Sequence, residues 1–252
     1  MAYSTIKTYS TAMAAALVAF GFSLPALAGP YRVDSPTVDP GILSLETRNH
    51  FDSDHRAADD GLQGYQLLMK YGMTDRMSIE LKTDGEHRPD QDFVAASSQM
   101  EVNYWLTKQK DNWFFDTAVR GYYRVSEESG VPDAVGSKFL VMKDLGKWTH
   151  VANLRIEKEV GENASKRTEF AFLWRTKYNY KTEFSPGFEI YDGFREFSHV
   201  GTYNEQKYNA GPVFFGKLGD HVRYDVGYLV GISGAAVDNI IKINLAYEFP
   251  YP

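Results

Sequence analysis

Residues 239–251 read NIIKINLAYEFPY, and this stretch decides the fold. Every second residue from Ile241 to Tyr251 is apolar or aromatic, whereas the intervening positions hold Lys242, Asn244 and Glu248. A period of two is that of a strand with one apolar face, and a helix would not produce it. The stretch is longer than the roughly five or six residues typical of strands in soluble sheets. It matches the roughly 9–11 residues that a tilted strand needs to cross a bilayer.

The same alternation recurs along the chain, and no helical periodicity separates its occurrences. We therefore predict twelve strands, at residues 42–51, 62–71, 77–83, 94–106, 113–125, 138–143, 148–159, 166–178, 182–194, 205–218, 222–232 and 239–251. The connections alternate between longer ones after odd strands and shorter ones after even strands. An even strand number with short turns and longer loops is typical of bacterial outer-membrane barrels. The predicted fold class is all-β: an antiparallel up-and-down transmembrane β-barrel of about 12 strands, built as one domain.

Some local features are less regular. The strand at 113–125 has the clearest alternation, with Trp113 and Phe115 on its apolar face, and the strand at 138–143 has the weakest. Pro186 removes a ladder donor and predicts a bulge. Residues 29–40 hold three prolines and no period, so we expect a lead-in segment on the periplasmic side of the barrel.

The N-terminal 28 residues have the pattern of a secretory signal peptide. Lys7 is the only charged residue, a short apolar core follows, and Ala26, Leu27 and Ala28 form a small-x-small cleavage site. No later stretch approaches the roughly 18 continuous apolar residues of a membrane-spanning helix. We expect cleavage after Ala28, a barrel domain at 29–252 and export to the cell outer membrane.

Composition excludes several function classes. The chain has 27 basic and 33 acidic residues, a net charge of −6, which is unlike the basic surface of a nucleic-acid-binding protein. It has no cysteine, so disulfides, thiol chemistry and thiolate metal sites are excluded. We find no motif for a cofactor or a resident metal and expect neither, and we expect no nucleic-acid partner.

Alternation alone does not separate a membrane barrel from a soluble one, because the two place the apolar face on opposite sides. Three features favour the membrane: twelve strands exceed the roughly eight that side chains can fill, the charged face runs along whole strands, and aromatic residues gather near the short turns. A girdle of aromatic residues at the interface is typical of membrane barrels. The predicted girdle residues are Tyr71, Tyr104, Trp113, Trp148, Tyr178 and Tyr251. The alternative is a secreted two-sheet β-protein.

The start of the predicted barrel domain carries a family resemblance. Residues 29–30 are Gly-Pro, 34–36 are Asp-Ser-Pro, 39–40 are Asp-Pro, and the first strand opens with Gly41. This pattern resembles the small transporter-like, porin-like outer-membrane barrels of proteobacteria, among them the phenol-degradation-pathway channels. Oligogalacturonate-specific porins are a similar twelve-strand class, although no distinctive motif ties this chain to them. The resemblance implies a porin-like role in outer-membrane lipid and names no solute.

The last strand also resembles the closing strand of outer-membrane barrels, which implies recognition by the barrel-assembly machinery. Pro250 and Pro252 depart from that pattern, since the family usually ends on the aromatic residue itself.

The polar faces of the strands predict a charged lumen. The candidate pore-lining residues are Arg48, Glu80, Glu101, Asp116, Arg120, Arg124, Arg155, Glu157, Arg175, Arg223, Asp225 and Lys242. The same face also holds Glu46, Lys70, Lys82, Arg167, Glu169 and Glu248. These charges would either select solutes in a pore or form cross-strand ion pairs that fill a narrow barrel. For a constriction we favour Arg120, Arg124, Arg155 and Arg223, which lie near strand middles.

Two functions remain open. The first is passive passage of small polar or charged solutes through the lumen. The second is a closed barrel with a structural or surface-binding role through the loops at 52–61, 84–92, 126–135 and 195–204.

Enzymatic and metal-binding interpretations are weaker. His87, His150, His199 and His221 have Ser or Asp neighbours only at spacings that are common by chance, so we expect no enzyme, and lipid hydrolysis is the least favoured function. Asp52, Asp54, Asp59 and Asp60 offer oxygen ligands for Ca²⁺. A solvated acidic loop is the simpler interpretation of these four residues.

Overall fold

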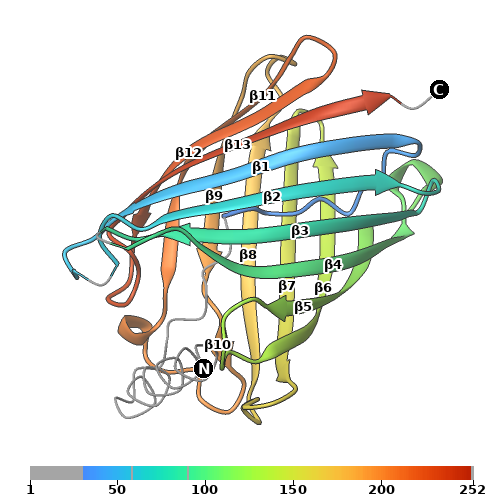
Figure 1. Ribbon diagram of the computed structural model, residues 1–252. Helices are drawn as coiled ribbons and strands as arrows, with labels where there is room; N and C mark the ends of the chain where they lie inside the picture. Colours follow the sequence, from blue (N-terminus) through green and yellow to red (C-terminus); the bar gives the residue numbers. More distant parts are fainter. Residues whose placement is uncertain (1–30, 58, 90, 251–252) are drawn as a thin grey trace, which may run out of the picture.

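The computed structural model describes residues 31–57, 59–89 and 91–250, which form a closed antiparallel β-barrel of twelve long strands and one very short one (Figure 1). The long strands are β1 (Ile42–Ser53), β2 (Gln63–Gly72), β3 (Met77–His87), β4 (Val94–Thr107), β5 (Asp116–Ser126), β6 (Asp133–Leu145), β7 (Trp148–Val160), β8 (Thr168–Tyr178), β9 (Ser185–Asp192), β11 (Tyr208–Leu218), β12 (Val222–Gly231) and β13 (Asn239–Pro250). The predicted fold class is confirmed. The expected signal peptide lies outside the described residues.

Consecutive strands pair around the ring, and β1 closes it against β13 in a continuous register from Ile42↔Pro250 to Ser53↔Asn239. The two-residue strand β10 (Arg195–Glu196) pairs with β8 beside the point where β8 meets β9. Two 3-10 helices, η1 (Gln109–Asp111) and η2 (Tyr203–Glu205), lie in the connections. Within the described residues, no helix is long and apolar enough to cross a membrane.

The wall of the barrel is apolar outside and polar inside. In β13, Ile243 is 43% exposed, whereas its neighbour Lys242 is fully buried in the lumen. Leu154 and Val226 also face outward, as the alternation predicted, and Arg120 faces inward with 1% exposure. A soluble β-protein would have the reverse arrangement, so this distribution has the character of a membrane barrel.

Some local predictions were wrong. β5 begins at Asp116, because residues 109–115 form η1 and an irregular stretch; Trp113 and Phe115 are exposed there but precede the strand. The bulge expected at Pro186 is absent, since its pairing with Phe214 continues the register of β9 and β11. Pro186 lies at the start of β9, before the pairing with β8 begins, so its missing N–H breaks no ladder there. The weakly patterned strand proved to be the long strand β6.

Aromatic side chains gather at the short-turn end. Trp113, Tyr104 and Trp148 are exposed there, and the rings of Trp148 and Tyr178 lie 5.0 Å apart. Tyr71 is partly buried, and the predicted girdle residue Tyr251 lies outside the described residues.

The segment 31–40, expected as a lead-in on the periplasmic side, lies inside the barrel. It runs through the lumen as an extended chain, visible in blue behind β2 and β3 in Figure 1, and reaches β1 at the short-turn end. At that end Gly41 donates its N–H to the Gly72 carbonyl (2.8 Å). A Cβ on Gly72 would come within 2.0 Å of the Asp39 carbonyl oxygen, so the close approach of the two chains requires glycine here.

Candidate functional site: the lumen and its N-terminal segment

The lumen-facing side chains form a charge cluster at the centre of the barrel. Glu101 on β4 accepts from Lys82 Nζ (2.6 Å), Lys138 Nζ (2.8 Å) and Arg120 Nη1 (3.0 Å). Arg120 also contacts Glu80 at 3.1 Å. All five side chains are nearly fully buried. The wall thus supplies three cations and two carboxylates to this cluster, an excess of one positive charge.

Asp34, from the segment 31–40, supplies the missing carboxylate. Its Oδ2 lies 3.1 Å from Lys138 Nζ and 3.3 Å from Arg120 Nη1, and Oδ1 lies 3.7 Å from Arg48 Nη2. The segment therefore balances the charge of the wall at this level. Because a buried ion pair is stable only when both partners are present, Asp34 and the wall hold each other in place.

Lumen asparagines bind the backbone of the segment. Asn153 accepts from the Asp34 N–H (2.7 Å) and donates to the Asp34 carbonyl (2.8 Å), so one amide satisfies both backbone groups of that residue. Asn103 donates to the Pro36 carbonyl (3.3 Å), and Asn244 to the Tyr31 carbonyl (3.4 Å). A chain without strand partners needs such acceptors and donors when it is buried.

The segment also has an apolar contact and a second ionic one. Val33 is fully buried in a cluster with Val151, Leu173 and Val213, which lines the lumen side of β7, β8 and β11. Arg32 contacts Asp225 on β12, and its Nε lies 3.8 Å from Glu46 on β1. The segment is therefore fixed to opposite parts of the wall by both charge and packing.

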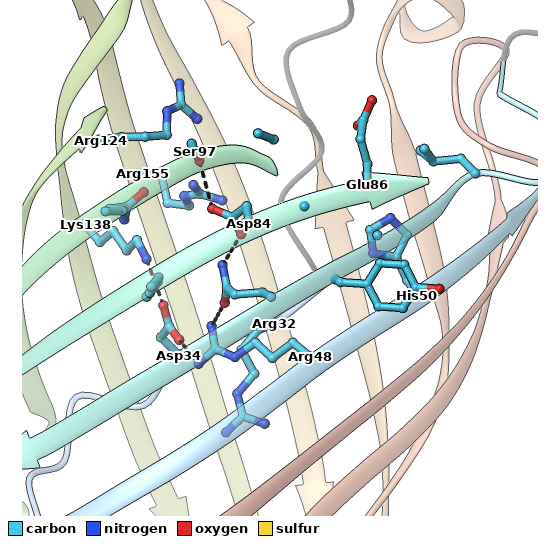
Figure 2. A pocket seen from close by; sticks show the side chains of 18 residues that line it. Arg32, Asp34, Arg48, His50, Asp84, Glu86, Ser97, Arg124, Lys138 and Arg155 are labelled. Carbon is cyan, nitrogen blue, oxygen red and sulfur yellow. Dashed lines mark hydrogen bonds and ion pairs between the residues drawn. The ribbon is translucent and has the colours of Figure 1, made fainter. Parts of the chain in front are cut away.

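The segment lies between two cavities of the lumen, and Arg32 lines both. The cavity at the long-loop end measures about 70 Å³. Its lining includes Arg32 and Asp34 of the segment and Arg124 and Arg155 of the wall. Figure 2 shows this cavity, with Ser97 bonded to Asp84 and Lys138 bonded to Asp34. Gln66 hydrogen-bonds both Asp84 and Arg48, and Arg48 lies 3.7 Å from Asp34. We call the second cavity, at the short-turn end, the short-turn cavity; it measures about 720 Å³.

The short-turn cavity is lined by residues of β1, β6, β7, β8, β9, β11, β12 and β13 and by the turn at 179–182. Arg32 and Ser35 of the segment form its inner boundary, so the segment separates it from the smaller cavity. Its cationic lining residues are Arg32, Arg175, Lys177, Lys181, Lys217 and Arg223, and its carboxylates are Glu46, Asp144 and Asp225.

All twelve candidate pore-lining residues lie on the lumen side of the wall. Arg48, Arg124 and Arg155 line the smaller cavity, and Arg175, Arg223 and Asp225 line the short-turn cavity. Ion pairs with other strands hold Glu80, Glu101, Arg120, Glu157 and Lys242. Asp116, at the short-turn end, accepts from the Gln109 N–H and lines neither cavity. The four arginines favoured for a constriction do not converge, since Arg120 lies in the central cluster. Whether these residues line a conduction path stays a prediction.

One residue of the wider charged face was misplaced. Arg167 precedes β8, is exposed and pairs with Glu196 (2.7 Å) outside the lumen. The remaining five, Glu46, Lys70, Lys82, Glu169 and Glu248, lie on lumen-side positions of their strands.

The acidic stretch predicted as a solvated loop at 52–61 is solvated only in part: Asp60 is exposed and Asp59 is half-buried, whereas Asp52 belongs to β1. Asp52 and Asp54 are buried, and Asp54 accepts from Nε and Nη2 of Arg56, each at 2.7 Å. These hydrogen bonds hold the pKa of the Asp54 carboxyl well below its usual range. Arg56 also donates to the carbonyls of Ala235 and Ala236, so it ties this loop to the one before β13.

This loop cluster argues against the calcium alternative. Asp54, His55 and Asp238 do place ligand atoms within 4.8 Å of one another. The Asp54 oxygens, however, are already engaged by the Arg56 guanidinium, which occupies the place a cation would take. Among the described residues, no histidine side chain hydrogen-bonds a serine hydroxyl.

Comparisons with known proteins agree with this geometry at the level of the fold. A KdgM porin has a TM-score of 0.56 with 10% identity, over 82% of this chain and 99% of that chain. A NanC porin has a TM-score of 0.59 with 12% identity, over 81% and 100%. The COG4313 outer membrane channel from Pseudomonas putida F1 has a TM-score of 0.59 with 10% identity, over 89% and 99%. No family model and no curated protein matches the sequence.

The chain therefore has the fold of porin-like outer-membrane barrels. These structural neighbours are porins and a channel by name. At identities near 10% the likeness concerns the fold alone, and the finer assignment to the phenol-degradation channels stays a prediction.

Sequence reasoning missed the segment 31–40 as part of the site. Its only signal is the pair Arg32 and Asp34, two charges spaced like the lumen side of a strand in a stretch without other periodicity. That pair is too short to distinguish a lumen segment from an exposed one.

Proposed function

We propose that the protein is an outer-membrane channel for small polar or charged solutes, with the segment 31–40 as its occluding element. The observation that carries this proposal is the division of a charged lumen by a segment fixed through side chains and not through a strand ladder. A barrel with a purely structural role has little need of a large, charged cavity at one end.

The attachment of the segment favours a removable occlusion. Its contacts are ion pairs of Asp34 and Arg32, three asparagine amides and the buried Val33. Each contact can exchange for water without breaking the ladder of the barrel, because none belongs to the strand register. Passive passage would then follow displacement of the segment from the centre of the lumen.

The proposal includes the cellular location. We propose export through residues 1–28, cleavage after Ala28, and assembly in outer-membrane lipid by the barrel-assembly machinery, which would recognise the closing strand β13. The outward apolar faces of β7, β12 and β13 support the lipid environment.

A reversible cross-link tests the role of the segment. Ser35 Oγ lies 3.6 Å from Met142 Sδ on β6, and the chain has no cysteine. The double variant Ser35→Cys with Met142→Cys therefore offers one thiol pair for a disulfide between segment and wall, without competing thiols, and loss of free thiols on oxidation checks that the disulfide forms. In planar bilayers we expect discrete openings of the wild-type protein, few or none for the oxidised double variant, and their return on reduction.

The single variants Ser35→Cys and Met142→Cys are the controls and should conduct in both redox states. Equal conductance of the oxidised and reduced double variant would show that the segment does not control the pore. A silent bilayer from wild-type protein that migrates as a folded, heat-modifiable species would favour the closed structural barrel instead.

A further inference from the structure

We infer that the short-turn cavity is a binding site for a small organic anion, one with a carboxylate and a flat apolar body. The inference rests on the proposed function, because it names the class of solute that a channel of this kind would hold. Its volume of about 720 Å³ is within the range of cavities that enclose small molecules, roughly 300–1,000 Å³.

The positive charge of this cavity is not balanced by its own lining. Six cationic side chains face three carboxylates there, unlike in the central cluster. Lys217 and Arg223 share one further carboxylate, Glu248, at 3.0 Å and 2.7 Å. Within the described part of the chain, Lys177 has no carboxylate oxygen within ion-pair distance, so it is available to a ligand.

Arg175 is the buried cation of the site. It is 8% exposed, and its nearest carboxylate is Glu189, 3.9 Å away. Glu189 already accepts from Lys242 at 2.6 Å, so it is shared between two cations. Arg175 Nε has no hydrogen-bond partner among the described residues. A guanidinium with free N–H groups at a cavity wall is suited to a carboxylate, which it binds through two parallel hydrogen bonds.

The apolar part of the site lies against the same two cations. Phe215 on β11 is 9% exposed, and its ring centroid lies 5.2 Å from the Arg175 guanidinium carbon and 5.9 Å from Lys177 Nζ. Tyr180 and Tyr224 add two further rings to the lining. A flat apolar body can pack on these rings while its carboxylate reaches Arg175 and Lys177. This places an anion-binding position and a stacking surface side by side.

The experiment uses benzoate as the probe and benzamide, its uncharged isostere, as the matched comparison. Isothermal titration calorimetry of the full-length folded protein in detergent should show benzoate binding at least tenfold more tightly than benzamide. Arg175→Gln and Lys177→Gln should each weaken benzoate binding about tenfold, as loss of a hydrogen bond to a charged group does. They should leave benzamide binding nearly unchanged.

Lys158→Gln is the control, since it removes one positive charge from an exposed position of β7 outside both cavities. Lys177→Arg should retain benzoate binding, and heat-modifiable migration of every variant checks folding. Equal binding of benzoate and benzamide, or benzoate binding that Arg175→Gln and Lys177→Gln leave intact, would overturn the inference. Conductance without benzoate binding would contradict the anion site but not the proposed channel function. Benzoate binding by a protein that does not conduct would support the anion site and contradict the channel function.

Discussion

The central cluster and the short-turn cavity are built from the same residue types but differ in how completely their charges are paired. In the central cluster, Glu101 is fully buried and binds three cations, and Asp34 completes the balance. In the short-turn cavity, Arg175 has only a shared carboxylate at 3.9 Å, and Lys177 lacks one among the described residues. The first region therefore resembles a closed structural network, and the second resembles a surface prepared for a ligand.

This difference shows that charged side chains on the inner face of one barrel can have different roles at different levels of the lumen. Lumen charges were expected to be either a pore lining or a network that fills the barrel, and the two interpretations apply to different levels of one lumen. The segment 31–40 marks the boundary, because it supplies Asp34 to the cluster and Arg32 and Ser35 to the cavity wall.

The largest expected effect is on the free energy of unfolding, which a substitution in the central cluster should lower far more than one in the short-turn cavity. Glu101→Ala leaves Lys82, Lys138 and Arg120 buried with one fewer carboxylate, and breaking such a network costs about 3–5 kcal/mol. Lys177→Gln in the cavity should change the free energy of unfolding by less than about 0.5 kcal/mol. Urea unfolding in lipid vesicles measures both, and similar costs for the two variants would contradict the distinction.

The next prediction tests whether the outer face of the wall contacts lipid, since both the central cluster and the short-turn cavity are assigned to the lumen on that basis. Ile243→Arg puts a charge on the outer face near the middle of β13, where it should cost about 2–4 kcal/mol in a bilayer. Ile243→Leu is the matched control and should be nearly neutral. The same vesicle unfolding measurement applies, and a neutral Ile243→Arg would place this face away from hydrocarbon.

A smaller effect is expected for the segment 31–40, which lies between the central cluster and the short-turn cavity. Asp34→Asn keeps the shape of the side chain but removes the charge that Arg120 and Lys138 share, so the segment should detach more readily. We expect a loss of about 1–3 kcal/mol in stability and several-fold more frequent openings in planar bilayers. Thr37→Ala, in the same segment, is the control; an unchanged opening frequency for Asp34→Asn would show that Asp34 does not hold the segment.

The smallest effect concerns ion preference. Arg223 is partly exposed at the short-turn cavity, so Arg223→Gln should shift the reversal potential modestly toward cation preference. The shift should be greatest in dilute salt and nearly vanish at about 1 M salt, where the screening length is about 3 Å. Arg155→Gln tests the smaller cavity in the same way. No shift at low salt for either variant would remove both arginines from the conduction path.

Much of the barrel wall could be predicted, because the residue pattern within each strand shows which side chains face lipid and which face the lumen. In β13 the choice of an outward Ile243 and an inward Lys242 follows from a two-residue period, and the pairing with β1 then follows from closure of the ring. Predictions failed where the alternation continued beyond the strand: Trp113 and Phe115 continue the apolar alternation, yet they precede β5, which begins at Asp116 after η1 and an irregular stretch.

The candidate site was less accessible to sequence reasoning. Inward charges such as Arg120 and Arg175 were placed on the correct face, but their partners come from different strands and from the segment. Asp34 and Lys138 are 104 positions apart in the chain, and no periodicity relates residues at that separation. Which cations are paired and which are free is a property of the assembled ring.

The strand pattern, the apolar exterior and the charged interior follow from the order of residues alone, because side-chain alternation is a local consequence of strand geometry. Three features follow only from the assembled barrel: residues 31–40 enter the lumen, Asp34 completes the central cluster, and Arg175 and Lys177 face a cavity with too few carboxylates. The physical reason is that charge pairing and free volume depend on distances across the barrel, and those distances exist only once the ring has closed.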